Sequence, residues 1–86
     1  MSTYKYEILS GIPPEEIEAY FKRISKEYRP PNTFCGEGWT VELERLFPIK
    51  NRIIIIPSTR ITFTGDESVC TKLIYTYRKK FMRGGG

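Results

Sequence analysis

Four consecutive isoleucines, residues 53–56, constrain the fold of this chain more than any other feature of its sequence. β-Branched side chains favour a strand, because they pack well on a pleated surface. Successive side chains of a strand point to opposite faces, so Ile53 and Ile55 are predicted to face one way and Ile54 and Ile56 the other. Both faces then need cover, from helices on opposite sides or from a second subunit. The run therefore predicts a homodimer through the isoleucine strand, unless the helices cover both sides of the sheet.

Two segments have the spacing of an amphipathic helix. The first is predicted over 14–28, because prolines suit a first turn, acidic residues follow, and Pro30 ends the pattern. The second is predicted over 66–82, with a capping-box pattern at 64–67 and cations in its last turns. A second interpretation of this segment stays open, in which strand-forming residues from Val69 to Tyr77 pair back on 61–64. The two apolar stripes comprise Ile17, Tyr20, Phe21, Ile24 and Tyr28, and Cys70, Leu73, Ile74, Tyr77 and Phe81.

Alternating apolar and polar residues predict strands over 4–9, 39–47 and 60–64, in addition to the isoleucine strand over 52–56. Turn-forming residues predict a loop over 30–38 and a tight turn over 57–59, and Pro48 predicts a bend or short edge segment. The predicted core comprises Tyr6, Ile8, Ile17, Phe21, Ile24, Trp39, Val41, Leu43, Ile53, Ile54, Ile55, Ile56, Ile61, Phe63, Leu73 and Tyr77.

These elements predict a two-layer α+β fold with a mainly antiparallel sheet of four to five strands and two helices. The order is β-α-β-(β)-β-β-α, which resembles the TATA-binding-protein-like, helix-grip class in topology and implies no function. The length predicts a single domain over 1–83, followed by a flexible glycine tail over 84–86. No apolar run approaches the roughly 20 residues that span a bilayer, and the first residues lack a signal-peptide pattern, so a cytoplasmic protein is predicted.

The residue types that are missing narrow the chemistry. The chain has no histidine, which excludes Ser-His-Asp and Cys-His catalysis and removes the commonest metal ligand. It also lacks a complete nucleotide-binding fingerprint. A non-enzymatic protein without metal or cofactor is therefore predicted. Cys35 and Cys70 are predicted to be free thiols, although a single bridge between them stays open. Glutamine is absent and asparagine is scarce, as is typical of thermophile proteins.

Charge is unevenly distributed along the sequence. Residues 1–43 carry a net charge of −2 and residues 44–86 a net charge of +6. Basic side chains neutralise phosphates and exposed tyrosines stack on bases, so the leading hypothesis is a dimeric binding module that contacts RNA, DNA or another acidic partner. The candidate nucleic-acid-binding residues are Lys72, Tyr75, Arg78, Lys79, Lys80 and Arg83.

Two further hypotheses stay open. The C-terminal glycines resemble the tail of ubiquitin-like sulfur carriers, which implies a cofactor-pathway accessory or carrier acting through Gly86. The β-grasp fold of such carriers starts with a hairpin before its helix, whereas one strand is predicted there in this chain. The other hypothesis is a small-ligand pocket between the closing helix and the sheet. Its candidate ligand loop comprises Phe34, Cys35, Gly36, Glu37, Gly38 and Trp39.

Overall fold

The structure is a computed structural model that describes residues 3–50, 52–53 and 55–81, without the side chains of residues 49, 56 and 57. Five strands form one sheet with the order β1-β5-β4-β3-β2, and every pair of neighbours is antiparallel. The chain is a two-layer α+β fold, as the sequence predicts. The elements are β1 (Tyr4–Ser10), α1 (Pro14–Ile24), β2 (Glu27–Arg29), β3 (Thr33–Gly36), β4 (Trp39–Lys50), β5 (Ile55–Gly65) and α2 (Glu67–Phe81).

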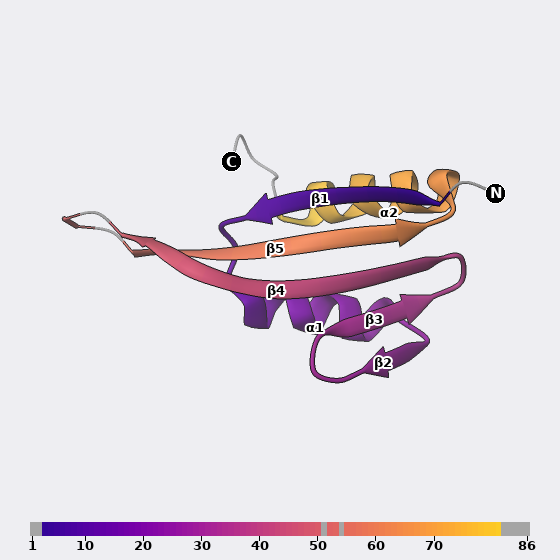
Figure 1. Cartoon of the computed structure of the whole chain (residues 1–86), viewed down its shortest axis with the longest axis horizontal. Helices are drawn as coiled ribbons and strands as arrows, with labels where there is room; N and C mark the ends of the chain where they lie inside the picture. The colour runs from indigo at the N-terminus through magenta and orange to yellow at the C-terminus, as the bar shows by residue number, and fades with distance from the viewer. Residues whose placement is uncertain (1–2, 51, 54, 82–86) are drawn as a thin grey trace.

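Both helices lie on the same face of the sheet, α1 behind β4 and β3 and α2 behind β1 and β5 (Figure 1). Aromatic contacts join them directly. The ring centroids of Tyr20 and Tyr77 are 6.4 Å apart, and those of Tyr20 and Phe81 are 5.5 Å apart. The opposite face of the sheet is mainly polar, with Glu44 and Arg60 on neighbouring strands joined by an ion pair of 2.9 Å. In the described part of the chain, the open face of the sheet is therefore not an apolar surface formed by isoleucine side chains.

The first helix is shorter than predicted. It ends at Ile24, where the N–H of Ser25 donates to the carbonyl of Phe21, so the predicted helix over 14–28 is wrong in its last turn. Tyr28 lies in β2 instead and pairs with Phe34, with ring centroids 4.9 Å apart. The predicted loop over 30–38 contains β3. Pairing with β4 overrides local turn propensity here, because strand propensity depends on neighbouring strands.

The hairpin of β4 and β5 is longer than predicted. β4 runs through Pro48, and β5 runs through the predicted turn at 57–59, so that turn is wrong. The register shifts between Leu46 and Ile49, opposite Pro57. Proline lacks the N–H that a ladder needs, and such an irregularity is where a strand tolerates it. Both prolines therefore lie at one bulge rather than at strand ends.

The second helix is confirmed, and the strand interpretation of this segment is wrong. Its first turn is capped by Asp66 rather than by Thr64, which lies in β5. Asp66 Oδ1 accepts hydrogen bonds from the N–H groups of Ser68 and Val69, at 3.0 and 3.2 Å. These contacts satisfy donors that a helix start otherwise leaves without partners.

The core lies between the two helices and β3, β4 and β5. Its buried residues are Ile17, Tyr20, Phe21, Phe34, Val41, Leu43, Ile61, Phe63, Cys70, Ile74 and Tyr77. Ile8, Trp39 and Leu73 are partly buried against it, as predicted. Four predicted core residues are exposed, namely Tyr6, Ile24, Ile53 and Ile55.

The isoleucine run is only partly a strand. Ile55 and Ile56 belong to β5, Ile53 lies in a bend, and Ile54 lies outside the described residues. Ile53 is 91% exposed and Ile55 is 65% exposed, so the prediction that both are core residues is wrong. The reason is the length of the β4–β5 hairpin, which extends beyond both helices at the left of Figure 1. Neither of the two described helices extends along the projecting end of this hairpin in that view.

Candidate functional site

The candidate site on α2 lies on the helix face opposite the stripe of residues that the core buries. Cys70, Ile74 and Tyr77 point into the core, and Phe81 packs against it. Residues on the opposite side of a helix then face solvent. Among the candidates, the structure exposes Lys72, Tyr75, Arg78, Lys79 and Lys80.

Tyr75 and Lys79 are neighbours on this exposed face. The Tyr75 side chain is 64% exposed, and the Lys79 ammonium lies 5.4 Å from its ring centroid. A cation over a ring at this distance is attracted by the ring quadrupole. The face therefore combines an accessible aromatic ring with positive charge, two features that proteins combine when they bind single-stranded nucleic acid.

Arg78 is placed differently from the other candidates. Its Nη2 donates to the Tyr6 hydroxyl at 3.1 Å, and its guanidinium carbon lies 5.8 Å from the Tyr6 ring centroid. The side chain is therefore directed toward β1. Arg83, the last candidate of this set, lies outside the described residues.

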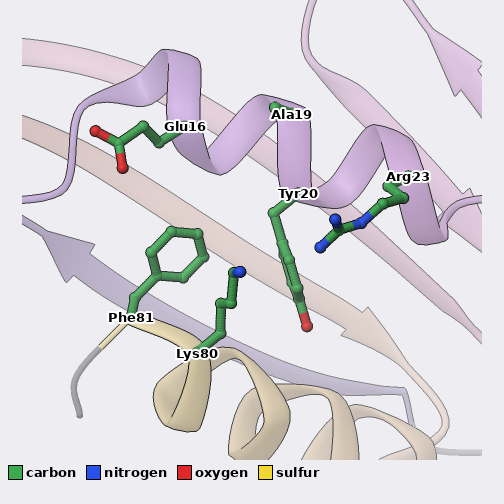
Figure 2. Close-up of a pocket in the computed structure, with 6 residues that line it drawn as sticks. All are labelled: Glu16, Ala19, Tyr20, Arg23, Lys80 and Phe81. Atoms are coloured by element: carbon green, nitrogen blue, oxygen red, sulfur yellow. The ribbon is translucent and has the colours of Figure 1, made fainter.

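A hollow of about 250 Å³ lies between the two helices, near the end of α2. Figure 2 shows Tyr20 and Arg23 extending from α1, and Lys80 and Phe81 extending from α2 on the other side. Burial raises the pKa of Tyr20, and the nearby positive charge of Arg23 opposes this shift. The hollow thus has an aromatic wall, the two cations Arg23 and Lys80, and the carboxylate of Glu16. No local sequence pattern predicts this hollow, because it forms where α1 and α2 face each other in the tertiary structure.

The candidate ligand loop belongs to the β3–β4 hairpin. Phe34 is fully buried in the core. Gly36 packs on the indole ring of Trp39, and a Cβ at this glycine would lie 2.1 Å from a ring atom. Glu37 and Lys26 form an exposed ion pair of 2.9 Å, and the hydrogen bond from Lys26 lowers the pKa of Glu37.

Close packing therefore accounts for the aromatic residues and Gly36 of this loop. Gly38, at φ +82, provides the left-handed backbone that the hairpin turn needs. Ligand binding at the loop stays a prediction.

The two cysteines do not form a bridge. Both are free thiols, with Cys70 buried and Cys35 half-buried. Burial, together with the negative charge of Asp66, raises the pKa of the Cys70 thiol. Because thiolates rather than thiols are reactive, Cys70 is poorly suited to nucleophilic chemistry.

Neither a metal site nor a membrane-spanning helix is present in the described ranges. Among residues 3–50, 52–53 and 55–81, no group of three or more cysteine, aspartate or glutamate side chains is placed to hold a metal ion. In the same ranges, neither helix is both long and apolar enough to cross a membrane.

Comparison with known proteins identifies the family. The model of the family described as "Archaeal MoaD-like protein" matches residues 5–86, nearly the whole chain. A comparison with curated protein sequences gives no match. The family match includes the α2 surface, the hollow between the helices and the C-terminal glycines. The chain belongs to the archaeal MoaD-like family.

Proposed function

We propose that this chain is a small carrier protein of the sulfur-carrier type, which acts through its C-terminal glycine rather than through an active site of its own. The observation that carries the proposal is the archaeal MoaD-like family match, which extends through the glycines to residue 86. MoaD-like proteins are small ubiquitin-like sulfur carriers, and the carrier hypothesis from the sequence is the one that this family favours.

The chemistry requires a free glycine carboxylate at Gly86. One carboxylate oxygen attacks the α-phosphorus of ATP, pyrophosphate leaves, and an acyl adenylate forms. A hydrosulfide-level sulfur donor then attacks the acyl carbon, AMP leaves with the electron pair of the broken bond, and a thiocarboxylate remains. A partner enzyme supplies both steps, and the chain supplies the carboxylate. Glycines suit this role, because a backbone without side chains enters a narrow channel most easily.

The end of α2 is firmly attached to the core. The Phe81 ring lies 5.0 Å from that of Tyr77 and 5.5 Å from that of Tyr20, measured between centroids. Five residues follow Phe81 in the sequence. The core thus fixes the point from which the tail starts, and the exposed cations Lys79 and Lys80 lie directly before it. Such charges favour encounter with an acidic partner surface.

The fold itself does not carry the proposal. One strand, β1, precedes α1, whereas the β-grasp fold of ubiquitin-like carriers starts with a hairpin. The tail also follows a helix, and the described sheet is antiparallel throughout. Function is therefore assigned to the tail and the family, since one fold can host many activities.

A mercury-gel assay tests the proposal. The chain is tagged at its N-terminus, carries Cys35→Ser and Cys70→Ala so that no native thiol remains, and is recovered from cells that contain its activating system. A thiocarboxylate retards migration in a gel containing immobilised organomercury. We expect a retarded band that is absent from a variant lacking Gly86. A matched variant, Lys79→Glu with Lys80→Glu, keeps the tail and is expected to give a weaker band. Equal retardation without Gly86 would refute the proposal.

A second candidate function is contact with nucleic acid through α2, favoured by the exposed pairing of Tyr75 with Lys79. The comparisons lend it no support. It predicts retention on a heparin or RNA column that falls steeply with salt, because phosphate binding releases counterions. Lys79→Glu with Lys80→Glu should abolish the retention, whereas Lys5→Glu with Lys22→Glu changes the net charge equally and should preserve most of it. Retention that is insensitive to salt, or equal in both variants, would exclude this function.

A further inference from the structure

The hollow between α1 and α2 brings together polar side chains that lack partners. These are Glu16, Tyr20 and Arg23 from α1 and Lys80 from α2 (Figure 2). Within the part of the chain that the structure describes, none of the four side chains forms a hydrogen bond or an ion pair. The hollow therefore offers one carboxylate, one hydroxyl and two cations to a ligand.

The hydroxyl of Tyr20 is a donor held in place by the core. The residue is only 7% exposed, and its ring packs edge-on against the rings of Tyr77 and Phe81. Burial raises the pKa of Tyr20, so the hydroxyl keeps its proton at neutral pH. A protonated hydroxyl donates one hydrogen bond. Together with the two cations, it favours an anionic acceptor in the hollow.

The charges of the hollow are separated along α1. In Figure 2, Glu16 and Phe81 lie at one end and Arg23 at the other, and Lys80 extends from α2 between Phe81 and Tyr20. Glu16 and Arg23 are seven residues apart on the helix, which is about 10 Å at the rise of an α-helix. The hollow thus suits a ligand with a cation near Glu16 and an anion about 10 Å away.

The tail of this chain has the opposite charges at the same spacing. Five residues, 82–86, follow Phe81, which is itself part of the wall of the hollow. They reach at most roughly 17 Å, so the whole hollow is within their range. Arg83 and the carboxylate of Gly86 are three residues apart, roughly 10 Å in an extended chain. This distance matches the separation of Glu16 from Arg23.

From this match we propose that the hollow is a binding site for the end of the glycine tail, with the Gly86 carboxylate between Arg23 and Lys80. The Arg83 guanidinium pairs with Glu16 at the other end. The inference rests on the proposed carrier function, in which Gly86 has a free carboxylate. Exposed ion pairs are individually weak, but a tail tethered by a few residues meets the hollow at a high effective concentration. A bound tail keeps its carboxylate beside the exposed cations of α2 until a partner enzyme takes it.

The dimensions of the hollow suit a glycine segment. Its volume of about 250 Å³ is below the range of roughly 300–1,000 Å³ that is usual for small-molecule pockets. Ala19 lines it with a single methyl group, and glycines add no side chain, so the tail backbone can approach α1 closely. The carboxylate then accepts a hydrogen bond from the Tyr20 hydroxyl.

A zero-length cross-link tests the site in the purified, dilute chain. A water-soluble carbodiimide joins a carboxylate to an amine in contact with it, forming an amide with loss of water. We expect the link from Gly86 to Lys80, located by peptide mass spectrometry, to be at least about fivefold more abundant than the link from Gly86 to Lys79. Lys79 is the matched control, because its ammonium lies over the Tyr75 ring. Equal links to the two lysines, or no link to Lys80, would overturn the proposal.

Removal of the second cation tests the position of the carboxylate. Arg23→Gln should lower the yield of the Gly86–Lys80 link about threefold, because one of its ion pairs is lost. Arg78→Gln is the control, since this cation contacts Tyr6 rather than the hollow, and it should leave the yield unchanged. Equal yields from the two variants would contradict a carboxylate held at Arg23.

A charge exchange tests the other end of the tail. Glu16→Arg and Arg83→Glu each place like charges together, and each should lower the yield of the Gly86–Lys80 link. The double variant restores opposite charges in exchanged positions and should recover the yield. A double variant that links as poorly as the single variants would refute the pairing of Arg83 with Glu16.

The tail site and the carrier function can fail separately. Cross-linking uses the chain without its activating system, whereas the organomercury gel requires no contact in the hollow. A thiocarboxylate in a chain that gives no Gly86–Lys80 link would overturn the tail site alone. A link in a chain that never acquires a thiocarboxylate would overturn the carrier function alone.

Discussion

The replacement of Phe21 by alanine should destabilise this protein more than any change on its surface. Phe21 is fully buried, and its ring centroid lies between 5.1 and 6.3 Å from those of five other aromatic rings. Those rings belong to α1, α2, β3, β4 and β5, so one side chain joins both layers. Truncation of a buried phenylalanine costs about 3–5 kcal/mol, and the number of ring contacts favours the upper end of that range.

The free-energy cost of Phe21→Ala is large relative to the total free energy of unfolding. A chain of 86 residues has a free energy of unfolding of roughly 4–13 kcal/mol. Phe21→Ala should therefore lower Tm by at least about 12 °C, given about 4–8 °C per kcal/mol for a domain of this size. Urea unfolding of dilute protein, followed by the fluorescence of the single tryptophan, Trp39, measures the change directly. Tyr75→Ala is the control and should stay within about 0.5 kcal/mol of wild type. A loss below about 1 kcal/mol for Phe21→Ala would refute the packing described for this core.

Three further outcomes are expected. Tyr77→Phe removes the hydrogen bond of 2.8 Å that the Tyr77 hydroxyl donates to Ser10, and should cost about 0.5–1.5 kcal/mol near pH 7 by urea unfolding. Burial raises the pKa of Tyr77 above its ordinary value of 10.0, so the stability that this group contributes is complete below pH 10.0 and declines as the pH rises through the raised pKa. Tyr77→Phe should therefore flatten the alkaline limb of Tm against pH, and an unchanged limb would contradict this assignment. Asp66→Ala removes the cap of α2 and should lower Tm at pH 7, whereas Asp66→Asn should recover most of the loss. Hydrogen bonds from Ser68 and Val69 lower the pKa of Asp66. The difference in Tm between wild type and Asp66→Ala should therefore vanish as the pH falls through that lowered value. Cys35 should react with a thiol reagent in the folded protein while Cys70 reacts only on unfolding, and equal rates for the two thiols would contradict the burial of Cys70.

Helical periodicity predicted the two helices because a buried stripe repeats along each of them. The stripe of α2 includes Cys70, Ile74 and Tyr77, which the core buries, although only Tyr77 of these three was among the predicted core residues. In α1 the same rule extended the helix to Tyr28, whose position fits the stripe by spacing although its backbone pairs with β3. Periodicity reports only that a side chain is apolar and suitably spaced. It cannot distinguish a fourth helical turn from a short strand that packs on the same core.

The isoleucine run shows a different limit. Its β-branched residues correctly favoured a strand, and Ile55 lies in β5. Burial depends on which elements pack on that strand, and Ile55 remains 65% exposed. Strand propensity therefore did not predict whether the isoleucine side chains are buried, because burial depends on how far the neighbouring elements extend.

The candidate site was predictable in part. Lys72, Tyr75 and Lys79 are exposed on α2 because the apolar stripe fixes the rotation of the helix. The contact of Arg78 with Tyr6 and the hollow between α1 and α2 both join residues far apart in the sequence. Such contacts follow from tertiary packing, which no local pattern encodes.

The central claim, that this chain acts as a carrier through Gly86, is tested most directly by the intact mass of the protein recovered from cells that contain its activating system. A fraction of the chain should carry a mass gain that corresponds to the replacement of one oxygen atom by sulfur, and fragmentation should place it on the C-terminal glycine. Treatment with a thiol-alkylating reagent should convert that fraction to a single adduct at the same residue, in a chain with Cys35→Ser and Cys70→Ala. A mass that matches the unmodified sequence in every fraction, or a modification placed elsewhere, would contradict the carrier function.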